Sequence, residues 1–166
     1  MIYQTRAKLV IVLLLTIILG STPAFVQAQD MAYRKENLWD FLMYDVRVRY
    51  GYAVNYNAYF PRPRFGRDLK TMDGEPVTLK GFFLPVDVTG SAFVLSYYPM
   101  NMCFFCGDAG IETVVEILPK QDQVRRFQRL RTDNYISVKG KLMLNERNYN
   151  HLIYIIKDAE LVEVLK

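Results

Sequence analysis

Residues 136–144 carry the pattern that most restricts the folds open to this chain. Their side chains alternate in character, with Ile136, Val138, Gly140, Leu142 and Leu144 on one side and Ser137, Lys139, Lys141 and Met143 on the other. A period of two indicates a β-strand with one buried face. We therefore expect Val138 and Leu142 in a core, and Lys139 and Lys141 in solvent.

Alternating segments separated by turn residues predict four more strands. They are expected at 77–88, 92–98, 112–118 and 152–164, the last of them broken or bulged near Lys157 and Asp158. Turns are expected at Asp73-Gly74 and at Thr89-Gly90. All of these elements lie within residues 71–166, which we interpret as one domain.

A short helix is predicted between the third and fourth strands. Residues 122–130 place apolar side chains at three-residue spacing, with Asp122 as the expected N-cap. Gly81 and Gly140 lie inside strands, where small barrels bend. The fold class is therefore mainly β: a five-stranded OB-fold-like Greek-key barrel with one short helix between strands 3 and 4. An antiparallel β-sandwich with the same strand count is the alternative.

Residues 29–70 precede this domain and are rich in aromatic side chains. The pattern predicts one or two helical turns at 38–43 and an edge strand at 46–54, after which Pro61 and Pro63 interrupt regular structure. We interpret the segment as an N-terminal arm. Its aromatic side chains either pack on the main core or offer a partner a binding surface.

Residues 1–28 predict a cleaved signal peptide. Arg6 and Lys8 precede the apolar run 9–19, and a small-x-small cleavage site ends at Ala28. The run is shorter than the roughly 20 residues of a spanning helix. We expect a periplasmic or secreted protein with no stable membrane span after cleavage; an uncleaved anchor is the alternative.

Charge gives little indication of a partner. The chain carries a formal charge of +4, which falls to +2 when Arg6 and Lys8 leave with the leader, so we expect no nucleic-acid partner. Two basic clusters are interpreted as solvated surfaces, or alternatively as contacts for acidic lipid headgroups: Arg62, Arg64 and Arg67, and Arg125, Arg126, Arg129 and Arg131.

Cys103 and Cys106 are the only cysteines, and their spacing allows both sulfurs to meet one metal ion. The remaining ligands would have to come from residues near them in sequence or from the single histidine; the candidates are Met100, Met102, Asp108 and His151. Thioether and thiolate ligands together favour copper(I), whereas thiolates with imidazole or carboxylate suit zinc. Zinc or copper is therefore the expected ion, if the loop binds one.

Three other interpretations of the cysteine pair stay open. In an oxidising compartment the pair could close as a structural disulfide, exchange electrons as a thiol–disulfide oxidoreductase, or pack as two small apolar side chains. A strand follows the pair instead of the long helix that follows it in thioredoxin. The sequence shows no phosphate loop and no nucleophile elbow, and nothing in its spacing pairs a cysteine with His151 for catalysis.

Three segments resemble a known family. They are residues 73–85 (DGEPVTLKGFFLP), 103–112 (CFFCGDAGIE) and 138–142 (VKGKL). Over roughly residues 65–164 the chain resembles small secreted bacterial OB-type proteins of the uncharacterised family called domain of unknown function 3299, in the form with a Cys-x-x-Cys loop. The commoner form of the family has a Cys-His-Pro stretch in this loop, which is missing here, so no role of that histidine carries over. The resemblance implies the fold and the compartment, and no activity.

Together these observations predict a secreted or periplasmic binding or accessory protein that is not an enzyme. Its Cys-x-x-Cys loop is expected to bind a soft metal or to form a disulfide, and its partner is expected to be an envelope protein or a metal ion. The alternatives are a thiol–disulfide oxidoreductase and a protein-interaction module of the cell envelope that uses the aromatic arm.

Overall fold

The structure is a computed structural model that describes residues 22–36, 38–86, 92–107 and 109–165. Residues 1–37 and 38–166 are separate compact units. In the first unit, α2 (Thr22–Glu36) runs through the predicted cleavage position at Ala28, while the rest of the predicted leader lies outside the described residues. Within the described ranges, no helix combines the length and the apolar character needed to cross a membrane.

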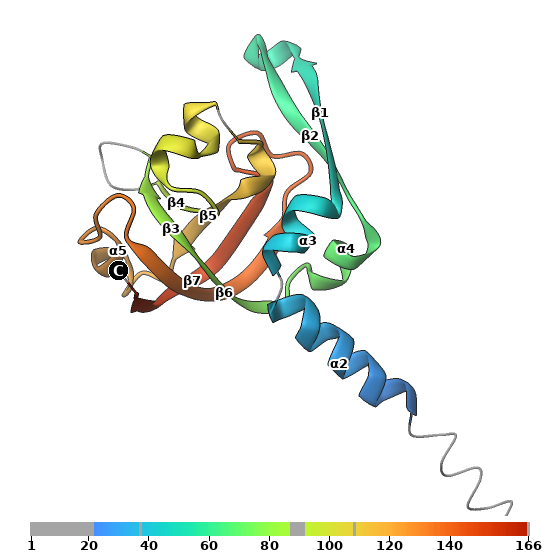
Figure 1. The fold of residues 1–166 in the computed structure, drawn as a ribbon. Helices are drawn as coiled ribbons and strands as arrows, with labels where there is room; N and C mark the ends of the chain where they lie inside the picture. The colour runs from blue at the N-terminus through green and yellow to red at the C-terminus, as the bar shows by residue number, and fades with distance from the viewer. Residues whose placement is uncertain (1–21, 37, 87–91, 108, 166) are drawn as a thin grey trace, which may run out of the picture. The chain divides into compact units, whose positions relative to one another are not determined.

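The second unit is built on a closed five-stranded β-barrel, which confirms the mainly β fold class (Figure 1). Its strands are β3 (Pro76–Pro85), β4 (Phe93–Ser96), β5 (Val114–Pro119), β6 (Tyr135–Leu144) and β7 (Tyr154–Val164). They follow one another around the barrel in the order β3-β4-β5-β7-β6, and β6 pairs with β3 to close it. The pairing of β5 with β7 is parallel and the other pairings are antiparallel.

The alternation in β6 has the register that the sequence predicts. Val138 and Leu142 are fully buried, while Lys139 and Lys141 are exposed. Ser137 differs from the expectation, because it is also buried although it lies on the outward side. Burying an aliphatic side chain of this size stabilises the fold by about 1.5–3 kcal/mol.

The predicted irregularity in the last strand is confirmed. The β5–β7 ladder pairs Leu118 with Lys157 and then Pro119 with Ala159, so Asp158 is skipped. Asp158 has a positive φ of 54°, which an aspartate tolerates better than most residues. The opposite strand has a glycine at this bend, since a Cβ atom on Gly140 would lie 2.7 Å from the Lys157 carbonyl oxygen.

The helix between β5 and β6 is shorter than expected. The structure has α5 (Val124–Phe127), and its N-cap is Gln123, so the predicted capping role of Asp122 is wrong. The cause is the position of the turn, because Gln123 itself closes a turn with Lys120 before the helix begins. The helix still buries Phe127, whose ring stacks on Phe93 at a centroid distance of 5.7 Å. The predicted Thr89-Gly90 turn lies outside the described residues, and the Asp73-Gly74 turn is present.

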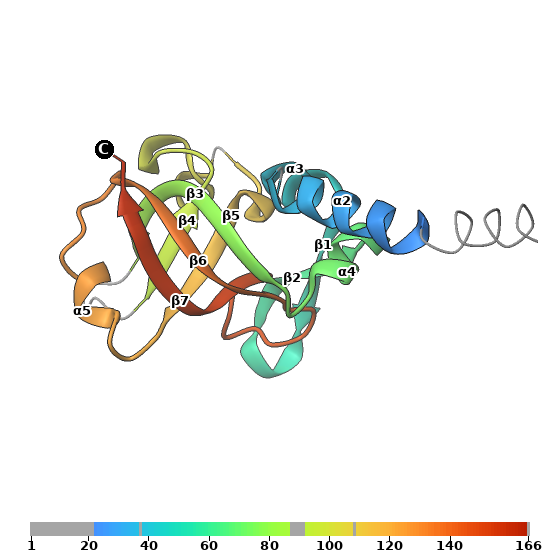
Figure 2. The ribbon, with the colours of Figure 1, turned by 90° about the horizontal axis from the view of Figure 1, so that it is seen from below.

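The segment before the barrel forms a two-stranded ribbon, β1 (Val46–Ala53) and β2 (Ala58–Phe65), joined by the 3-10 turn η1 (Val54–Tyr56). The prediction that Pro61 and Pro63 interrupt regular structure is wrong, because both lie within β2. Prolines at alternate positions place their missing N–H groups on one edge of a strand. Within the described part of the chain β2 pairs only with β1, so its other edge tolerates them. Figures 1 and 2 show the ribbon beside the barrel, with its turn extending past the barrel's end.

Two short helices hold the ribbon to the barrel: α3 (Leu38–Tyr44) before it and α4 (Arg67–Met72) after it. Both helices bury leucine or methionine side chains in the core; they are Leu38, Leu42, Leu69 and Met72. The buried Tyr154 hydroxyl of β7 donates a hydrogen bond of 2.7 Å to the Leu42 carbonyl oxygen. The Trp39 indole N–H donates to the Lys80 carbonyl oxygen of β3 at 2.7 Å. The base of the ribbon is therefore fixed at both ends.

Candidate functional site

The cysteine loop consists of two 3-10 turns, η2 (Met100–Met102) and η3 (Phe104–Cys106). The Cys106 N–H donates to the Cys103 carbonyl oxygen at 3.1 Å, so the two cysteines are the ends of one turn. Gly107 follows with φ 86° and ends the turn in the left-handed conformation that glycine adopts without steric cost. The local fold therefore brings the two cysteine backbones together.

The two sulfurs have different environments. Cys103 is fully buried and Cys106 is exposed, and the structure records both as thiols. The Cys106 thiol donates to the Met100 carbonyl oxygen at 2.8 Å. The Met100 N–H in turn donates to an Asp133 carboxylate oxygen at 2.7 Å. The loop is thus fastened to the chain segment before β6.

The predicted metal ligands that the structure describes lie in different surroundings. Met102 is half exposed, and His151 is bonded to Glu116 on β5, with 2.7 Å between Nδ1 and Oε1. Asp108 lies outside the described residues. Among the residues that the structure does describe, no three His, Cys, Asp or Glu side chains form a cluster that could hold a metal ion.

The loop between β6 and β7 is organised by Asn145. Its side-chain amide donates to the carbonyl oxygens of Asn148, His151 and Leu152 at 2.7, 3.2 and 3.0 Å. Its side-chain oxygen accepts from the N–H groups of Arg147 and Asn148 at 3.3 and 2.8 Å. One asparagine therefore satisfies five polar contacts of the loop backbone, which fixes its course.

Glu116 fixes the far end of the same loop. One carboxylate oxygen meets His151 and the other accepts from the Leu152 N–H at 2.9 Å. The near end is held by Asp73, which accepts from the Leu144 N–H at 2.9 Å. The β6–β7 loop is therefore anchored to the barrel and to the segment that follows α4.

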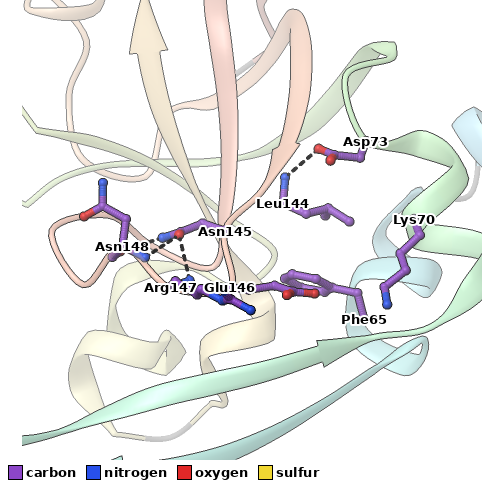
Figure 3. Close-up of a pocket in the computed structure, with 8 residues that line it drawn as sticks. All are labelled: Phe65, Lys70, Asp73, Leu144, Asn145, Glu146, Arg147 and Asn148. Carbon is purple, nitrogen blue, oxygen red and sulfur yellow. Dashed lines mark hydrogen bonds between the residues drawn. The ribbon is translucent and has the colours of Figure 1, made fainter. Parts of the chain in front are cut away.

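Two hollows lie between this loop, α4 and the ribbon. The first has a volume of about 550 Å³, and Figure 3 shows its lining. The second has a volume of about 740 Å³. They share Phe65, Lys70, Glu146 and Arg147, and the second is extended by Arg62, Pro63, Arg64 and Tyr149. We call the second hollow the ribbon-base pocket.

A smaller hollow of about 200 Å³ lies between the cysteine loop, the β6–β7 loop and the ribbon. Phe104, His151 and Tyr149 line it, together with Phe60 of the ribbon. The Phe60 and Tyr149 rings stack at a centroid distance of 4.6 Å. His151, a predicted metal ligand, therefore lines the same hollow as Phe104 of the cysteine loop and Phe60 of the ribbon.

The two faces of the ribbon differ in chemistry. The strand register places Tyr50 opposite Pro61 and Tyr52 opposite Tyr59, so these side chains share one face. The other face has two directly opposed arginine pairs, Arg47 with Arg64 and Arg49 with Arg62. All four arginines are exposed. We call the outer part of the first face the tyrosine tip; it consists of Tyr50, Tyr52 and Tyr59 at the ribbon's free end.

Sequence reasoning missed the residues that build the β6–β7 loop. Asn145, Glu116 and Arg147 were not among the predicted candidates. An asparagine that opens a loop containing Asn148 and Asn150 was the available signal, because asparagine side chains commonly bond the backbone two or three residues on. No comparable signal linked Glu116 to His151, which is 35 residues away.

Comparison with known proteins assigns no family. No protein-family model matches the sequence, and none of the curated proteins compared with it is significantly similar. The resemblance to domain of unknown function 3299 therefore stays a prediction.

Proposed function

We propose that this chain is a binding or accessory protein of the cell envelope, that it is not an enzyme, and that the tyrosine tip is its partner-binding surface. The observation that carries this proposal is the exposure of Tyr59 and Tyr50, which are 70% and 57% exposed on one ribbon face. Tyr52 shares that face and is 45% exposed.

Tyrosine is well suited to such a surface. It offers a large, stiff apolar ring with a polar hydroxyl at its end, and it is enriched in protein interfaces for this reason. The Tyr52 and Tyr59 rings meet edge to face at a centroid distance of 5.2 Å, so they are held in place before any partner arrives. Rings ordered in advance lose less conformational entropy on binding.

The ribbon also supplies backbone groups. Among the residues that the structure describes, β1 and β2 pair only with each other, so each strand has an open edge. Open edges pair readily with a strand of another protein. The prolines of β2 remove N–H donors from its free edge, so the free edge of β1 is the one suited to pairing. A partner that contacts the tyrosine tip could therefore add backbone hydrogen bonds along β1.

We further propose that the barrel is an OB-fold. The barrel order β3-β4-β5-β7-β6, with its parallel β5–β7 pairing, and the position of α5 between β5 and β6 support this assignment. An OB-fold would agree with the resemblance to domain of unknown function 3299. That resemblance in turn implies the secreted or periplasmic location that we propose for the chain after removal of residues 1–28. In such a barrel the loop between the last two strands is one of the loops beside the binding face.

Crosslinking from the tyrosine tip tests the proposed function. A photocrosslinking amino acid is placed at position 59 or, as control, at the exposed barrel position Lys157, and the protein is produced in its native cell envelope. We expect a discrete adduct from position 59 only. Its partner, identified and purified, should bind the mature chain directly, and the Tyr50→Ser/Tyr59→Ser double variant should weaken this binding tenfold or more.

Equal adducts from both positions would contradict the proposal. So would an identified partner whose affinity is unchanged in the double variant. An adduct formed with a second copy of the chain would make the tip a self-association surface, which sedimentation of the double variant should then show as a monomer.

The cysteine turn favours a second role, a disulfide that stiffens the loop. Cα atoms at the ends of such a turn lie within about 7 Å, which is near the upper limit of the usual disulfide range. Closing the bond needs no third ligand, whereas zinc or copper binding needs ligands beyond Cys103 and Cys106. Elemental analysis and thiol counting on protein from its native envelope separate the alternatives: no reactive thiol indicates a disulfide, and bound metal indicates a metal loop.

A thiol–disulfide oxidoreductase stays the alternative of another class. It requires that the pair exchange with glutathione at an accessible potential, whereas structural disulfides typically lie below about −300 mV. The burial of Cys103 places the exposed Cys106 as the sulfur that an external thiol could reach. A redox titration of Cys103→Ser and Cys106→Ser beside the natural chain decides whether exchange occurs and through which sulfur.

A further inference from the structure

We propose that the ribbon-base pocket binds the phosphate group of an anionic ligand, held by Arg62, Arg64, Lys70 and Arg147. This site lies at the base of the ribbon and is separate from the tyrosine tip. The proposal stands independently of the proposed function, because it depends on different side chains.

The first observation is the charge balance of the pocket. Four cationic side chains line it against one carboxylate, Glu146, which leaves a formal charge of +3. Arg64, Lys70 and Arg147 have no ion pair among the described residues. By contrast, Lys120 and Lys139 both meet the Glu160 carboxylate. The pocket therefore gathers positive charge that the described residues leave largely uncompensated.

The second observation is the register of the ribbon. Arg64 lies directly opposite Arg47, and Arg62 lies directly opposite Arg49. Like charges placed directly opposite each other across two strands destabilise the pair. The Arg62 guanidinium crosses over Gly51 and donates to the Tyr52 carbonyl oxygen at 3.2 Å, which orients it on the ribbon. Of the four arginines, Arg62 and Arg64 line the pocket, so an anion bound there would offset part of the repulsion between each of them and its opposite arginine.

The third observation is that the pocket is built before a ligand arrives. Arg147 lies on the loop that Asn145 organises, and its own N–H donates to the Asn145 side chain. Lys70 lies on α4, whose first turn is fixed because the Leu69 N–H donates to Asp45 at 2.9 Å. Arg62 and Arg64 lie on a paired strand. Three independent segments thus present cations to one hollow from fixed backbones.

Size and charge define the class of ligand. A volume of about 740 Å³ is in the usual range for small-molecule pockets. Guanidinium groups present a planar fork of donors that matches phosphate oxygens. A formal charge of +3 matches an anion with two or more charges better than a single carboxylate. The phosphate could belong to a free phosphate compound or to a lipid headgroup, and the experiment separates these sources.

The first test measures binding of inorganic pyrophosphate to the mature chain by calorimetry at low and moderate salt. The pocket variant is Arg64→Gln/Arg147→Gln, and the matched control is Arg125→Gln/Arg129→Gln, which removes two exposed arginines from the region of α5. We expect the pocket variant to weaken binding about tenfold or more, since it removes two guanidinium groups, and hydrogen bonds between a guanidinium and a phosphate are among the strong ones in proteins. The control should change binding less than twofold.

A third variant separates a built site from diffuse charge. Asn145→Ala keeps every charge and removes the contacts that shape the loop, so it should also weaken pyrophosphate binding several-fold while circular dichroism shows an intact barrel. If Asn145→Ala unfolds the chain, Lys70→Gln replaces it, with a weakening of about tenfold expected. Equal losses in the pocket variant and the matched control, or an unchanged affinity in the pocket variant, would overturn the proposal.

The second test uses phosphatidylcholine vesicles with and without phosphatidic acid. Binding to the acidic vesicles that the pocket variant loses and the control keeps would assign the phosphate to a lipid headgroup. Pyrophosphate binding without binding to acidic vesicles would assign it to a free compound. Binding to neither probe overturns the proposal.

Discussion

The hydroxyl group of Tyr154 joins the barrel to the helix that precedes the ribbon, and removing it gives the sharpest test of how the ribbon is held. Tyr154 is fully buried in β7, and its hydroxyl donates to the Leu42 carbonyl oxygen of α3 at 2.7 Å. The variant Tyr154→Phe keeps the ring and removes only this donor. Because Leu42 is itself fully buried, we expect no water to replace the lost partner.

The expected loss follows from the cost of a buried polar group without a partner. Removing one partner of a buried hydrogen bond costs about 1–3 kcal/mol. The variant Tyr59→Phe is the control, because that side chain is 70% exposed and its hydroxyl can bond to water instead. Surface changes of this kind usually stay within about 0.5 kcal/mol.

Urea denaturation of the mature chain at neutral pH measures both variants. We expect the free energy of unfolding to fall by about 1–3 kcal/mol for Tyr154→Phe and by less than about 0.5 kcal/mol for Tyr59→Phe. Equal values for the two variants would refute the role given to the Tyr154 hydroxyl.

The pH dependence supplies a second measure of the same group. Burial, and then the nearby Glu112 and Asp45 carboxylates, raise the pKa of Tyr154 above its ordinary value near 10. The folded state therefore keeps this proton while the unfolded chain loses it, so stability is present below pH 10 and falls as pH rises further. The difference in stability between the natural chain and Tyr154→Phe should shrink above pH 10; a constant difference would contradict the burial of an ionisable hydroxyl.

Three further predictions test the barrel, its surface and the leader. Val138→Ala should lower the free energy of unfolding by about 2 kcal/mol because it opens a cavity at a fully buried site, whereas the exposed Lys141→Ala should stay within about 0.5 kcal/mol; equal effects in denaturation curves would show that the register of β6 is wrong. Hydrogen bonds from Lys120 and Lys139 lower the pKa of Glu160 to about 2, so the stability that Glu160 contributes is present above its unfolded pKa near 4.5 and is lost as pH falls toward 2. Glu160→Gln should therefore lose less stability than the natural chain when denaturation is followed over this pH range. An identical acid profile in the two proteins would contradict the cluster of Glu160 with Lys120 and Lys139. N-terminal sequencing of the mature protein should begin at Gln29, and a chain that retains residues 9–19 would instead indicate an anchor.

The barrel strands could be predicted because the alternation of apolar and polar residues lies within each strand's own sequence and needs no information about its neighbours. The alternation around Val138 gives β6 its register, and the skipped position at Asp158 has a local signal in the Lys157-Asp158 pair. The prediction that Asp122 caps α5 was wrong because the Gln123 N–H donates to the Lys120 carbonyl oxygen and closes a turn just before the helix. The preference of aspartate for N-cap positions does not take such a preceding turn into account. The prediction that Pro61 and Pro63 interrupt regular structure was wrong for a related reason. A proline interrupts a strand only where a neighbouring strand needs a hydrogen bond from that position, and the sequence does not show which positions these are.

The site could be predicted only where its residues are neighbours in sequence. The turn that joins Cys103 and Cys106 is local, and their three-residue spacing is enough to indicate that the two side chains lie near each other. The ribbon-base pocket joins β2, α4 and the β6–β7 loop, so Arg64, Lys70 and Arg147 meet only through tertiary packing. The tyrosine tip is intermediate, because the aromatic content of the arm is visible in the sequence while the exposure of Tyr59 depends on where the ribbon ends relative to the barrel.

The two proposed binding surfaces are tested most directly by titrating two ligands against two variants. The ligands are the partner identified from position 59 and inorganic pyrophosphate; the variants are Tyr50→Ser/Tyr59→Ser and Arg64→Gln/Arg147→Gln. We expect the tyrosine variant to bind the partner tenfold or more weakly and to bind pyrophosphate with unchanged affinity. We expect the arginine variant to bind pyrophosphate about tenfold more weakly and the partner with unchanged affinity. Loss of both ligands in both variants, with the barrel intact by circular dichroism, would contradict two separate surfaces on one ribbon.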